Sequence, residues 1–372
     1  MMETKNTGGK FLPLPLQALT AVAAKQDRLT FASFELTSRC NLKCGMCYVR
    51  AEAGDRTRAD AELSGEVWLD IARQALDAGV VTLLITGGEP LLHRDFQQIF
   101  SGVSRMGFVV GINTNAVLIN AGWIDFFREY TPHRVNVSLY GASQATYERM
   151  CGVPEGYRLA VDGIDRLLNA GIGVSIRTTA TAENMEDIPE ILAFAKSRGI
   201  PVQCNPYAFP PMRRETGGDV PADRPDAQRV AELMVTTAER TKAPEVLKKM
   251  YERVRRIDPA AEVRFDKQSA CSAGRSSMWI TWDGRMLPCG LLEELSADVL
   301  NLGVTQSWKE ILMCRDKMQF PDECCVCAYK NACFGCPALH RHETGSFQIK
   351  SSYVCNINKI YFKLLNSINS LY

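Results

Sequence analysis

The feature that most constrains the fold is a regular alternation of apolar runs and amphipathic helical patterns between residues 31 and 205. The short apolar runs are typical of buried strands, and the segments between them repeat apolar residues with helical spacing. Strands that alternate with helices in this way predict βαβ units and a parallel sheet. The sequence therefore predicts an α/β fold with a partial (β/α)6 TIM-like barrel. The six predicted strands are 31–36, 81–85, 108–112, 134–139, 173–178 and 201–204.

The helical patterns are clearest where apolar residues recur at i, i+3, i+4 and i+7, as at Trp68, Ile71, Ala72 and Ala75. Further patterns cover 160–168 and 188–195, and two more polar helices are predicted at 222–241 and 244–257. The chain accordingly divides into four predicted parts. These are an N-terminal extension (1–30), the barrel (31–206), a bridging region (207–267) and a small C-terminal domain (268–372).

Three cysteines follow the first predicted strand at C-x3-C-x2-C spacing: Cys40, Cys44 and Cys47. Active sites of such barrels lie at the carboxyl ends of the strands, so this loop is on the expected face. Three thiolates on one loop can converge on one metal centre. A structural zinc site normally has four protein ligands. A 4Fe–4S cluster held on three irons keeps its fourth iron open for a small molecule.

The second predicted strand ends in Gly87-Gly88-Glu89-Pro90. Glycines allow a backbone to approach a ligand closely. Backbone carbonyls and the Glu89 carboxylate can accept hydrogen bonds from an ammonium group. Without the cysteine loop, the same residues would be read as a simple strand-to-helix turn.

The two motifs together resemble the radical S-adenosylmethionine (radical SAM) superfamily. The resemblance implies that Cys40, Cys44 and Cys47 hold a 4Fe–4S cluster whose open iron binds SAM. An electron from a donor such as flavodoxin or ferredoxin then splits SAM into methionine and a 5′-deoxyadenosyl radical. Gly87, Gly88 and Glu89 would bind the amino group of SAM.

The resemblance also assigns polar residues at later strand ends to SAM. Asn115 and Ser138 would contact the ribose hydroxyls, and Arg177 the methionine carboxylate, by bidentate guanidinium recognition. Read alone, each could be a capping or surface residue. The family often has an aromatic residue against adenine where this chain has Met46, with Tyr48 just after the motif. Both are retained as candidate adenine contacts.

A second cysteine set occupies the last hundred residues. Cys271 and Cys289 belong to a C-x12-G-x4-C element that reads as a β-hairpin turning at Asp283-Gly284. Two C-x2-C pairs could form a zinc site, and such zinc modules could instead bind a partner protein. Seven spaced cysteines exceed the ligands of one zinc ion, which indicates two metal centres. The remaining five are Cys324, Cys327, Cys333, Cys336 and Cys355.

This order resembles the SPASM extension of radical SAM enzymes, which binds two auxiliary 4Fe–4S clusters, although the family's last internal spacing is usually x3 rather than x2. The resemblance implies that Cys271, Cys289 and Cys336 hold the first cluster. It assigns the second to Cys324, Cys327, Cys333 and Cys355. Three ligands leave an iron of the first cluster open for a substrate thiolate, unless Cys314 or Cys325 closes it. Cys151 and Cys204 are predicted to be buried apolar residues.

Composition and charge limit the partners and the cellular compartment that are expected for the protein. A net charge of +1 gives no electrostatic argument for nucleic acid or a membrane surface, and no apolar run of 18 residues occurs. Residues 11–24 imitate a signal peptide, but two prolines interrupt them. Fourteen cysteines without an export signal indicate metal binding in a reducing, cytoplasmic compartment.

By resemblance, the predicted function is a radical SAM oxidoreductase that crosslinks a ribosomally made precursor peptide (RiPP maturation), first of all by a cysteine thioether. Carbon–carbon crosslinking is the alternative bond. Sulfatase-maturase-like oxidation of a protein Cys or Ser is a further alternative, but those enzymes have an aspartate where this chain has Gly290. Because 1–30 is short for a leader-binding domain, a separate leader-binding protein is a possible partner.

Overall fold

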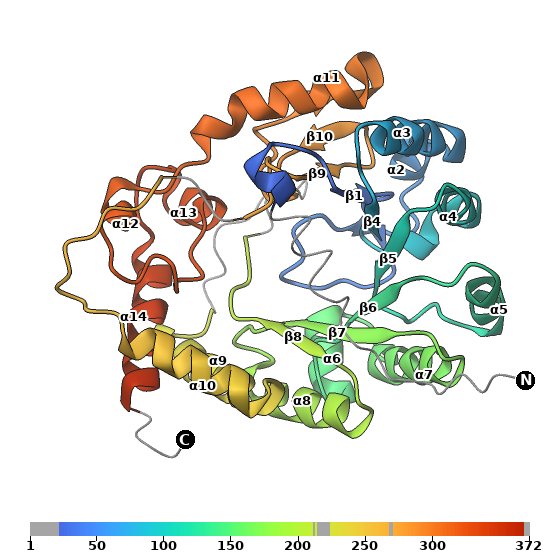
Figure 1. The fold of residues 1–372 in the computed structure, drawn as a ribbon. Helices are drawn as coiled ribbons and strands as arrows, with labels where there is room; N and C mark the ends of the chain where they lie inside the picture. The colour runs from blue at the N-terminus through green and yellow to red at the C-terminus, as the bar shows by residue number, and fades with distance from the viewer. Residues whose placement is uncertain (1–21, 211–212, 214–223, 268–270, 368–372) are drawn as a thin grey trace, which may run out of the picture.

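The computed structural model describes residues 22–210, 213, 224–267 and 271–367. Its centre is a nine-stranded sheet in the order β11-β10-β9-β1-β4-β5-β6-β7-β8. The six strands from β1 to β8 are parallel and curve into an open barrel with helices outside (Figure 1), so the predicted α/β partial barrel is confirmed. These strands are β1 (Phe31–Glu35), β4 (Thr82–Thr86), β5 (Val109–Thr114), β6 (Arg134–Ser138), β7 (Val174–Thr179) and β8 (Val202–Asn205).

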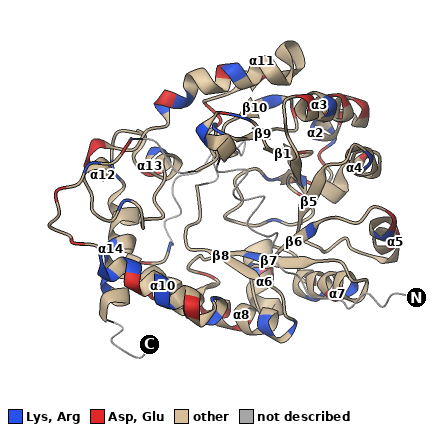
Figure 2. Ribbon diagram, viewed as in Figure 1, with Lys and Arg blue, Asp and Glu red and all other residues tan. Residues whose placement is uncertain are grey.

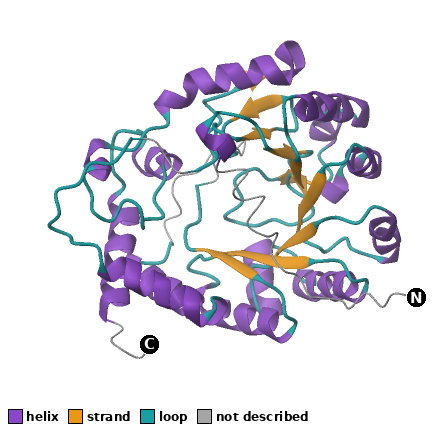
Figure 3. Cartoon of the chain, in the orientation of Figure 1, coloured by secondary structure: helices purple, strands orange, loops and turns teal. Residues whose placement is uncertain are grey.

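Helices follow the barrel strands and cover the outside of the sheet (Figure 3). Figure 2 shows acidic and basic residues mixed along outer helices such as α10. The helices up to the bridging region are α2 (Arg56–Ala61), α3 (Gly65–Asp77), α4 (Phe96–Arg105), α5 (Ala121–Glu129), α6 (Gln144–Cys151), α7 (Gly156–Asn169), α8 (Ile188–Ser197), α9 (Ala227–Thr241) and α10 (Pro244–Arg255). Short 3-10 turns lie at η1 (Pro90–Leu92) and η2 (Met185–Asp187).

Helix α3 shows how the sequence sets the barrel packing. The Ser64 side chain caps the helix by accepting a hydrogen bond from the Val67 N–H at 3.4 Å. The predicted apolar stripe is buried, and its Trp68 ring lies 5.0 Å from that of Phe34 on β1. The helix therefore holds the strand that leads into the cysteine loop.

The predicted hairpin at Asp283-Gly284 is present as antiparallel strands β9 (Ser277–Ile280) and β10 (Arg285–Leu287). It does not stand apart from the barrel, because β9 pairs in parallel with β1 and extends the barrel sheet beyond the predicted boundary at residue 268. Strand β11 (Ala297–Asp298) adds to its far edge. A separate two-stranded sheet joins β2 (Arg39–Cys40) to β3 (Ala51–Glu52) in the cysteine loop.

The remaining C-terminal region begins with a helix that packs on α3 and β10, and it continues into a loop-rich part that lies across from the barrel (Figures 1 and 3). Its elements are α11 (Val299–Cys314), η3 (Arg315–Lys317), α12 (Asp322–Cys325), α13 (Pro337–Thr344) and α14 (Ser352–Ser367). Phe362 and Leu365 of α14 pack on Leu247 and Tyr251 of α10, so the bridging helices attach this region to the barrel. Among the helices that the structure describes, none has the length and apolar character of a membrane span.

We predict that Trp68→Ala destabilises the barrel by about 3–5 kcal/mol, because it removes a fully buried aromatic side chain and leaves a cavity. The control is Leu76→Ala on the same helix, where the side chain is 38% exposed and the expected change is about 0.5 kcal/mol or less. Urea unfolding followed by circular dichroism measures both. Equal losses in the two variants would contradict the packing described here.

Candidate active site

The cysteine loop is held against the end of β4 by backbone hydrogen bonds. The Gly88 N–H donates to Thr37 O at 2.7 Å, and the Glu89 N–H donates to Arg39 O at 2.8 Å. A Cβ atom at Gly88 would lie 2.3 Å from the Arg39 carbonyl oxygen, so only glycine fits. Sequence reasoning assigned this glycine to a close approach to a ligand. The structure shows a close approach to the cysteine loop itself.

A buried ion pair that the sequence did not reveal anchors the same loop. Arg39 donates two hydrogen bonds to the Glu62 carboxylate, at 2.7 and 2.9 Å, and others to the carbonyls of Ala53 and Leu92. Thr37 also donates to Glu62. Bidentate charged hydrogen bonds fix geometry as well as adding energy. The residues just before Cys40 are therefore rigidly placed.

Glu89 lies behind the wall of the site, with its side chain fully buried. Its carboxylate accepts hydrogen bonds from the Asn115 N–H and the Thr114 hydroxyl, each at 2.8 Å, and from the Leu91 N–H at 3.2 Å. Burial raises its pKa to about 7, and these hydrogen bonds oppose the rise. In the structure Glu89 shapes the end of β5. Its predicted contact with the SAM amino group stays a prediction.

A cavity of about 570 Å³ opens at the carboxyl ends of the barrel strands. Asn115 crosses from β5 to the cysteine loop, where its side-chain amide donates to Asn41 Oδ1 at 2.8 Å and lies 3.7 Å from Cys40 Sγ. The predicted site residues that line this central cavity are Cys40, Cys44, Met46, Cys47, Tyr48, Gly87, Gly88, Asn115, Ser138, Arg177 and, from the C-terminal set, Cys289. The structure thus brings together residues from five strand ends.

Arg177 belongs to a polar ladder across the barrel interior that sequence reasoning did not identify. Asn136 Oδ1 accepts from the Ser175 hydroxyl at 2.6 Å and from Arg177 at 3.4 Å, while its amide donates to Asn113 Oδ1 at 2.9 Å. Burial and the nearby charge of Arg134 lower the pKa of Arg177. An anion bound in the cavity would offset both effects.

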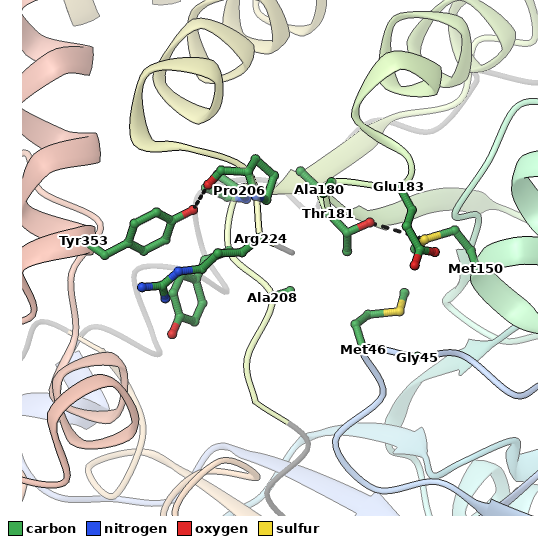
Figure 4. Close-up of a pocket in the computed structure, with 13 residues that line it drawn as sticks. Gly45, Met46, Met150, Ala180, Thr181, Glu183, Pro206, Ala208, Arg224 and Tyr353 are labelled. Atoms are coloured by element: carbon green, nitrogen blue, oxygen red, sulfur yellow. Dashed lines mark hydrogen bonds between the residues drawn. The ribbon is translucent and has the colours of Figure 1, made fainter. Parts of the chain in front are cut away.

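Met46 separates the central cavity from a second cavity of about 230 Å³. Its side chain points into this second cavity, together with Met150 and Ala180 (Figure 4). Tyr207 and Ala208 also line both cavities. Polar groups lie at both sides: Thr181 and Glu183 beside Met150, and Arg224, whose guanidinium stacks on the Tyr353 ring at 3.6 Å, across from them (Figure 4). The second cavity is therefore flanked by apolar and aromatic side chains and adjoins the cysteine loop.

The cysteine loop contacts a further thiol that was predicted only to be buried. Cys151 is fully buried at the end of α6, and its thiol lies within hydrogen-bond reach of Cys44. This contact is the largest cause of the raised pKa of Cys44, followed by burial. Burial is also the main cause of the raised pKa of Cys40. Forming thiolates here is costly unless a positive centre binds them, so the donor set fits a metal cluster.

The C-terminal cysteines form two groups. Cys271, Cys289 and Cys336 line a third cavity of about 70 Å³. Burial raises the pKa of Cys289 to about 12, and the charges of Cys271 and Cys336 add to the rise. Cys289 also lines the central cavity, so it lies between the two spaces. The predicted first auxiliary set is thus gathered beside the barrel site.

The second group surrounds Cys324. Burial raises the pKa of its thiol to about 12, with further contributions from the charges of Cys333, Cys327 and Cys355. The four predicted ligands of the second cluster are therefore neighbours. Within the described ranges, no three His, Cys, Asp or Glu side chains meet closely enough to share one metal ion. Thiolates of a 4Fe–4S cluster bind separate irons and need not meet at one point.

The other cysteines differ in their distance from these groups. Cys314 packs in the same apolar cluster as Cys289 and Cys336, around Leu292 and Met318. Cys325 is buried elsewhere, with its sulfur 4.0 Å from the Asp266 carbonyl oxygen. Of the two candidates to close the first set, Cys314 is therefore the nearer. Cys204 on β8 is only partly buried, so the prediction of a buried residue holds for Cys151 and not for Cys204. Desolvation still raises the pKa of the Cys204 thiol to about 12.

Comparison with known proteins agrees with this geometry. Residues 34–195 match the family model of the radical SAM superfamily. The family binds SAM and uses a 4Fe–4S cluster. The matched stretch runs from β1 to α8 and ends before the C-terminal cysteines. Ligation by those cysteines stays a prediction.

Similar proteins carry different names. An AdoMet-dependent heme synthase of Methanosarcina barkeri (strain Fusaro / DSM 804) is 26% identical, covering 86% of this chain and 95% of its own. A PqqA peptide cyclase of Rhizobium meliloti (strain 1021) is 25% identical, covering 81% and 80%. The crystal structure of Streptococcus suis SuiB bound to precursor peptide SuiA has a TM-score of 0.65 at 19% identity, covering 95% and 84%. The last likeness concerns the fold alone.

We predict that Cys44→Ala removes one cluster and about a third of the iron and acid-labile sulfide of the reconstituted protein, since it deletes one of only three predicted ligands. Cys151→Ala is the matched control, because it removes the adjacent buried thiol without removing a predicted ligand. Iron and sulfide analysis under anaerobic conditions measures both variants. Equal iron loss in the Cys151 variant would make Cys151 a ligand and contradict the assignment.

Proposed function

We propose that this protein is a radical SAM oxidoreductase that binds three 4Fe–4S clusters and crosslinks a precursor peptide by a cysteine thioether. The observation that carries the proposal is the position of Cys289, which lines both the central cavity and the cavity of the first auxiliary cysteine set. A peptide in the central cavity could therefore reach the radical source and the auxiliary site at once.

We place SAM across the two adjoining cavities in one orientation. Its carboxylate would pair with Arg177, whose lowered pKa reflects a desolvated cation with another arginine nearby. Its adenine would pass Met46 into the second cavity, toward Met150 and Ala180 (Figure 4). Asn115 and Ser138 line the space between, where the ribose hydroxyls would lie. Tyr48 turns its ring toward Arg213 instead, which makes Met46 the better adenine contact.

When bound, the cluster held by Cys40, Cys44 and Cys47 supplies the electron that splits SAM into methionine and a 5′-deoxyadenosyl radical. The protein's task is to place a substrate C–H bond beside the ribose end of SAM and to exclude water. Removal of that hydrogen gives 5′-deoxyadenosine and a substrate carbon radical. The carbon then bonds to a peptide cysteine sulfur, while the thiol proton and one electron leave. Each crosslink therefore costs the peptide two hydrogens.

Cys271, Cys289 and Cys336 would hold the first auxiliary cluster by three thiolates, which leaves an iron for the peptide cysteine. Cys324, Cys327, Cys333 and Cys355 would hold the second, and its thiolate ligation suits transfer of the surplus electron. A peptide substrate is supported by the likeness in fold to SuiB bound to precursor peptide SuiA, and by the PqqA peptide cyclase relative. Flavodoxin or ferredoxin as electron donor, a separate leader-binding protein and a cytoplasmic location belong to the same proposal.

A second candidate substrate is an iron tetrapyrrole. It is favoured by the relatives named AdoMet-dependent heme synthase, since the one from Methanosarcina barkeri aligns over nearly its whole length. The radical SAM site described here would serve either substrate. The two candidates differ in what must occupy the space beside Cys289.

We predict that Arg177→Met raises the Kd for SAM about tenfold or more, because it deletes a charged hydrogen bond worth about 1.5–3 kcal/mol. The control is Arg158→Met on the outer face of α7, where the arginine pairs with Glu155 and Asp162 in solvent. Equilibrium binding of SAM to the reconstituted protein measures both. Unchanged affinity in the Arg177 variant would contradict the orientation given above.

The function is tested with the reconstituted enzyme, dithionite and SAM, and with either a cysteine-containing peptide encoded beside the gene or iron coproporphyrin III. We predict 5′-deoxyadenosine and a peptide product lighter by two hydrogens per crosslink, measured by mass spectrometry. Changing Cys40, Cys44 and Cys47 together to Ala should abolish both. Turnover of the porphyrin but not the peptide would establish the second candidate. About two zinc ions and no acid-labile sulfide in the C-terminal region would exclude the auxiliary clusters.

A further inference from the structure

The wall of the central cavity next to Cys289 is formed by the indole of Trp279 on β9. The ring occupies the space that a side chain at position 290 would need. A Cβ atom at Gly290 would lie 2.9 Å from two indole carbons, closer than real Cβ atoms approach their neighbours. Trp279 and Gly290 are thus complementary, and the indole limits the volume available beside the Cys289 sulfur.

A buried carboxylate fixes the orientation of this ring. The Trp279 Nε1–H donates to Glu35 Oε2 at 3.0 Å, and Glu35 is fully buried at the end of β1. The parallel pairing of β1 with β9, which sets Ser33 opposite Trp279, brings the two side chains together. A buried tryptophan N–H that has a partner holds its ring in one orientation.

Arg213 neutralises that carboxylate and connects it to the cysteine loop. Its guanidinium donates to both oxygens of Glu35, at 2.8 and 2.6 Å, and its side chain is only 4% exposed. It also lies 5.1 Å from the centre of the Tyr48 ring, and its N–H donates to Tyr48 O at 2.9 Å. Removing one partner of such a buried pair strands the other charge. The side chains of Arg213, Glu35 and Trp279 therefore connect the residue after Cys47 to the cavity wall beside Cys289.

We propose that Trp279 determines which substrates reach the site beside Cys289, and that the Glu35–Arg213 ion pair positions its indole. This inference rests on the proposed function and deepens it. The favoured ligand is a peptide cysteine flanked by small residues, because the indole fills the volume that large neighbouring side chains would occupy. Specificity of this kind comes from steric exclusion of the larger ligand rather than from an added attraction to the smaller one.

The test uses the reconstituted enzyme with SAM and two capped tripeptides, acetyl-Gly-Cys-Gly-amide and acetyl-Leu-Cys-Leu-amide. Binding is followed by the change in the electron paramagnetic resonance spectrum of the auxiliary clusters. We predict that the glycine peptide binds about tenfold more tightly to the wild type, within the range expected for steric discrimination in a pocket. Trp279→Ala should bring the ratio close to one by improving binding of the leucine peptide.

Trp282→Ala is the matched control, because Trp282 lies just after β9, under the Arg58 guanidinium at 4.9 Å and away from the cavity lining. It should leave the ratio unchanged. Glu35→Gln should lower the ratio, whereas a merely structural role would lower stability and leave the ratio as it is. An unchanged ratio in Trp279→Ala, or equal binding of both peptides by the wild type, would overturn the proposal.

A second measurement does not depend on any peptide. Gly290→Val should lower the melting temperature of the wild type but not that of the Trp279→Ala variant, because the clash is with the indole. If this coupling is found and neither tripeptide binds, the thiolate-binding function fails while the Trp279 wall stands as described. If the coupling is absent, the wall itself is wrong and the specificity proposal falls with it.

Discussion

The site depends on the pairing of β1 with a parallel strand on each side. Strand β4 brings the Gly87-Gly88 turn to one side of the cysteine loop, and β9 brings Trp279 to the other. Because parallel strands end at a common edge, residues nearly 250 positions apart in sequence come to line one cavity. The C-terminal hairpin is therefore part of the barrel sheet, and the residues that follow β10 place Cys289 at the edge of the cavity.

Buried ion pairs then fix the position of the cysteine loop at the end of the sheet. Two bidentate pairs, Arg39 with Glu62 and Arg213 with Glu35, hold the residues on either side of the three-cysteine motif. The cysteine loop buries only a few apolar side chains of its own, chiefly Leu42 and Val49. Buried, fully hydrogen-bonded ion pairs give it a single geometry instead, since breaking either would leave an uncompensated charge away from water. The loop can thus stay ordered while its sulfurs face the cavity.

The sequence predicted those features that depend on residues close together in the chain. The six barrel strands, the apolar stripe of α3 and the hairpin at Asp283-Gly284 follow from periodicity and turn chemistry. The division of the C-terminal cysteines into two ligand sets came from the resemblance to the SPASM extension, and it stays a prediction. The long-range contacts escaped prediction. Arg213 and Glu35 are separated by 178 positions, and nothing near either residue marks it as half of a pair. The Cys44–Cys151 contact and the hydrogen bonds that turn Glu89 toward β5 likewise depend on packing across the barrel.

The two walls of the cavity come from different parts of the chain. This arrangement would allow relatives with the same barrel to have different substrates. The wall formed by Met46, Asn115 and Arg177 comes from the cysteine loop and from strand ends in the stretch that matches the radical SAM family model, and these residues are the predicted SAM contacts. The opposite wall, at Trp279 and Cys289, comes from the hairpin region outside that stretch. A carbon that is to react must lie between the two walls, within reach of the SAM ribose. On the proposed function, changes in the hairpin would alter which molecule fits without disturbing radical formation, and the indole held by Glu35 would be the side chain that decides it.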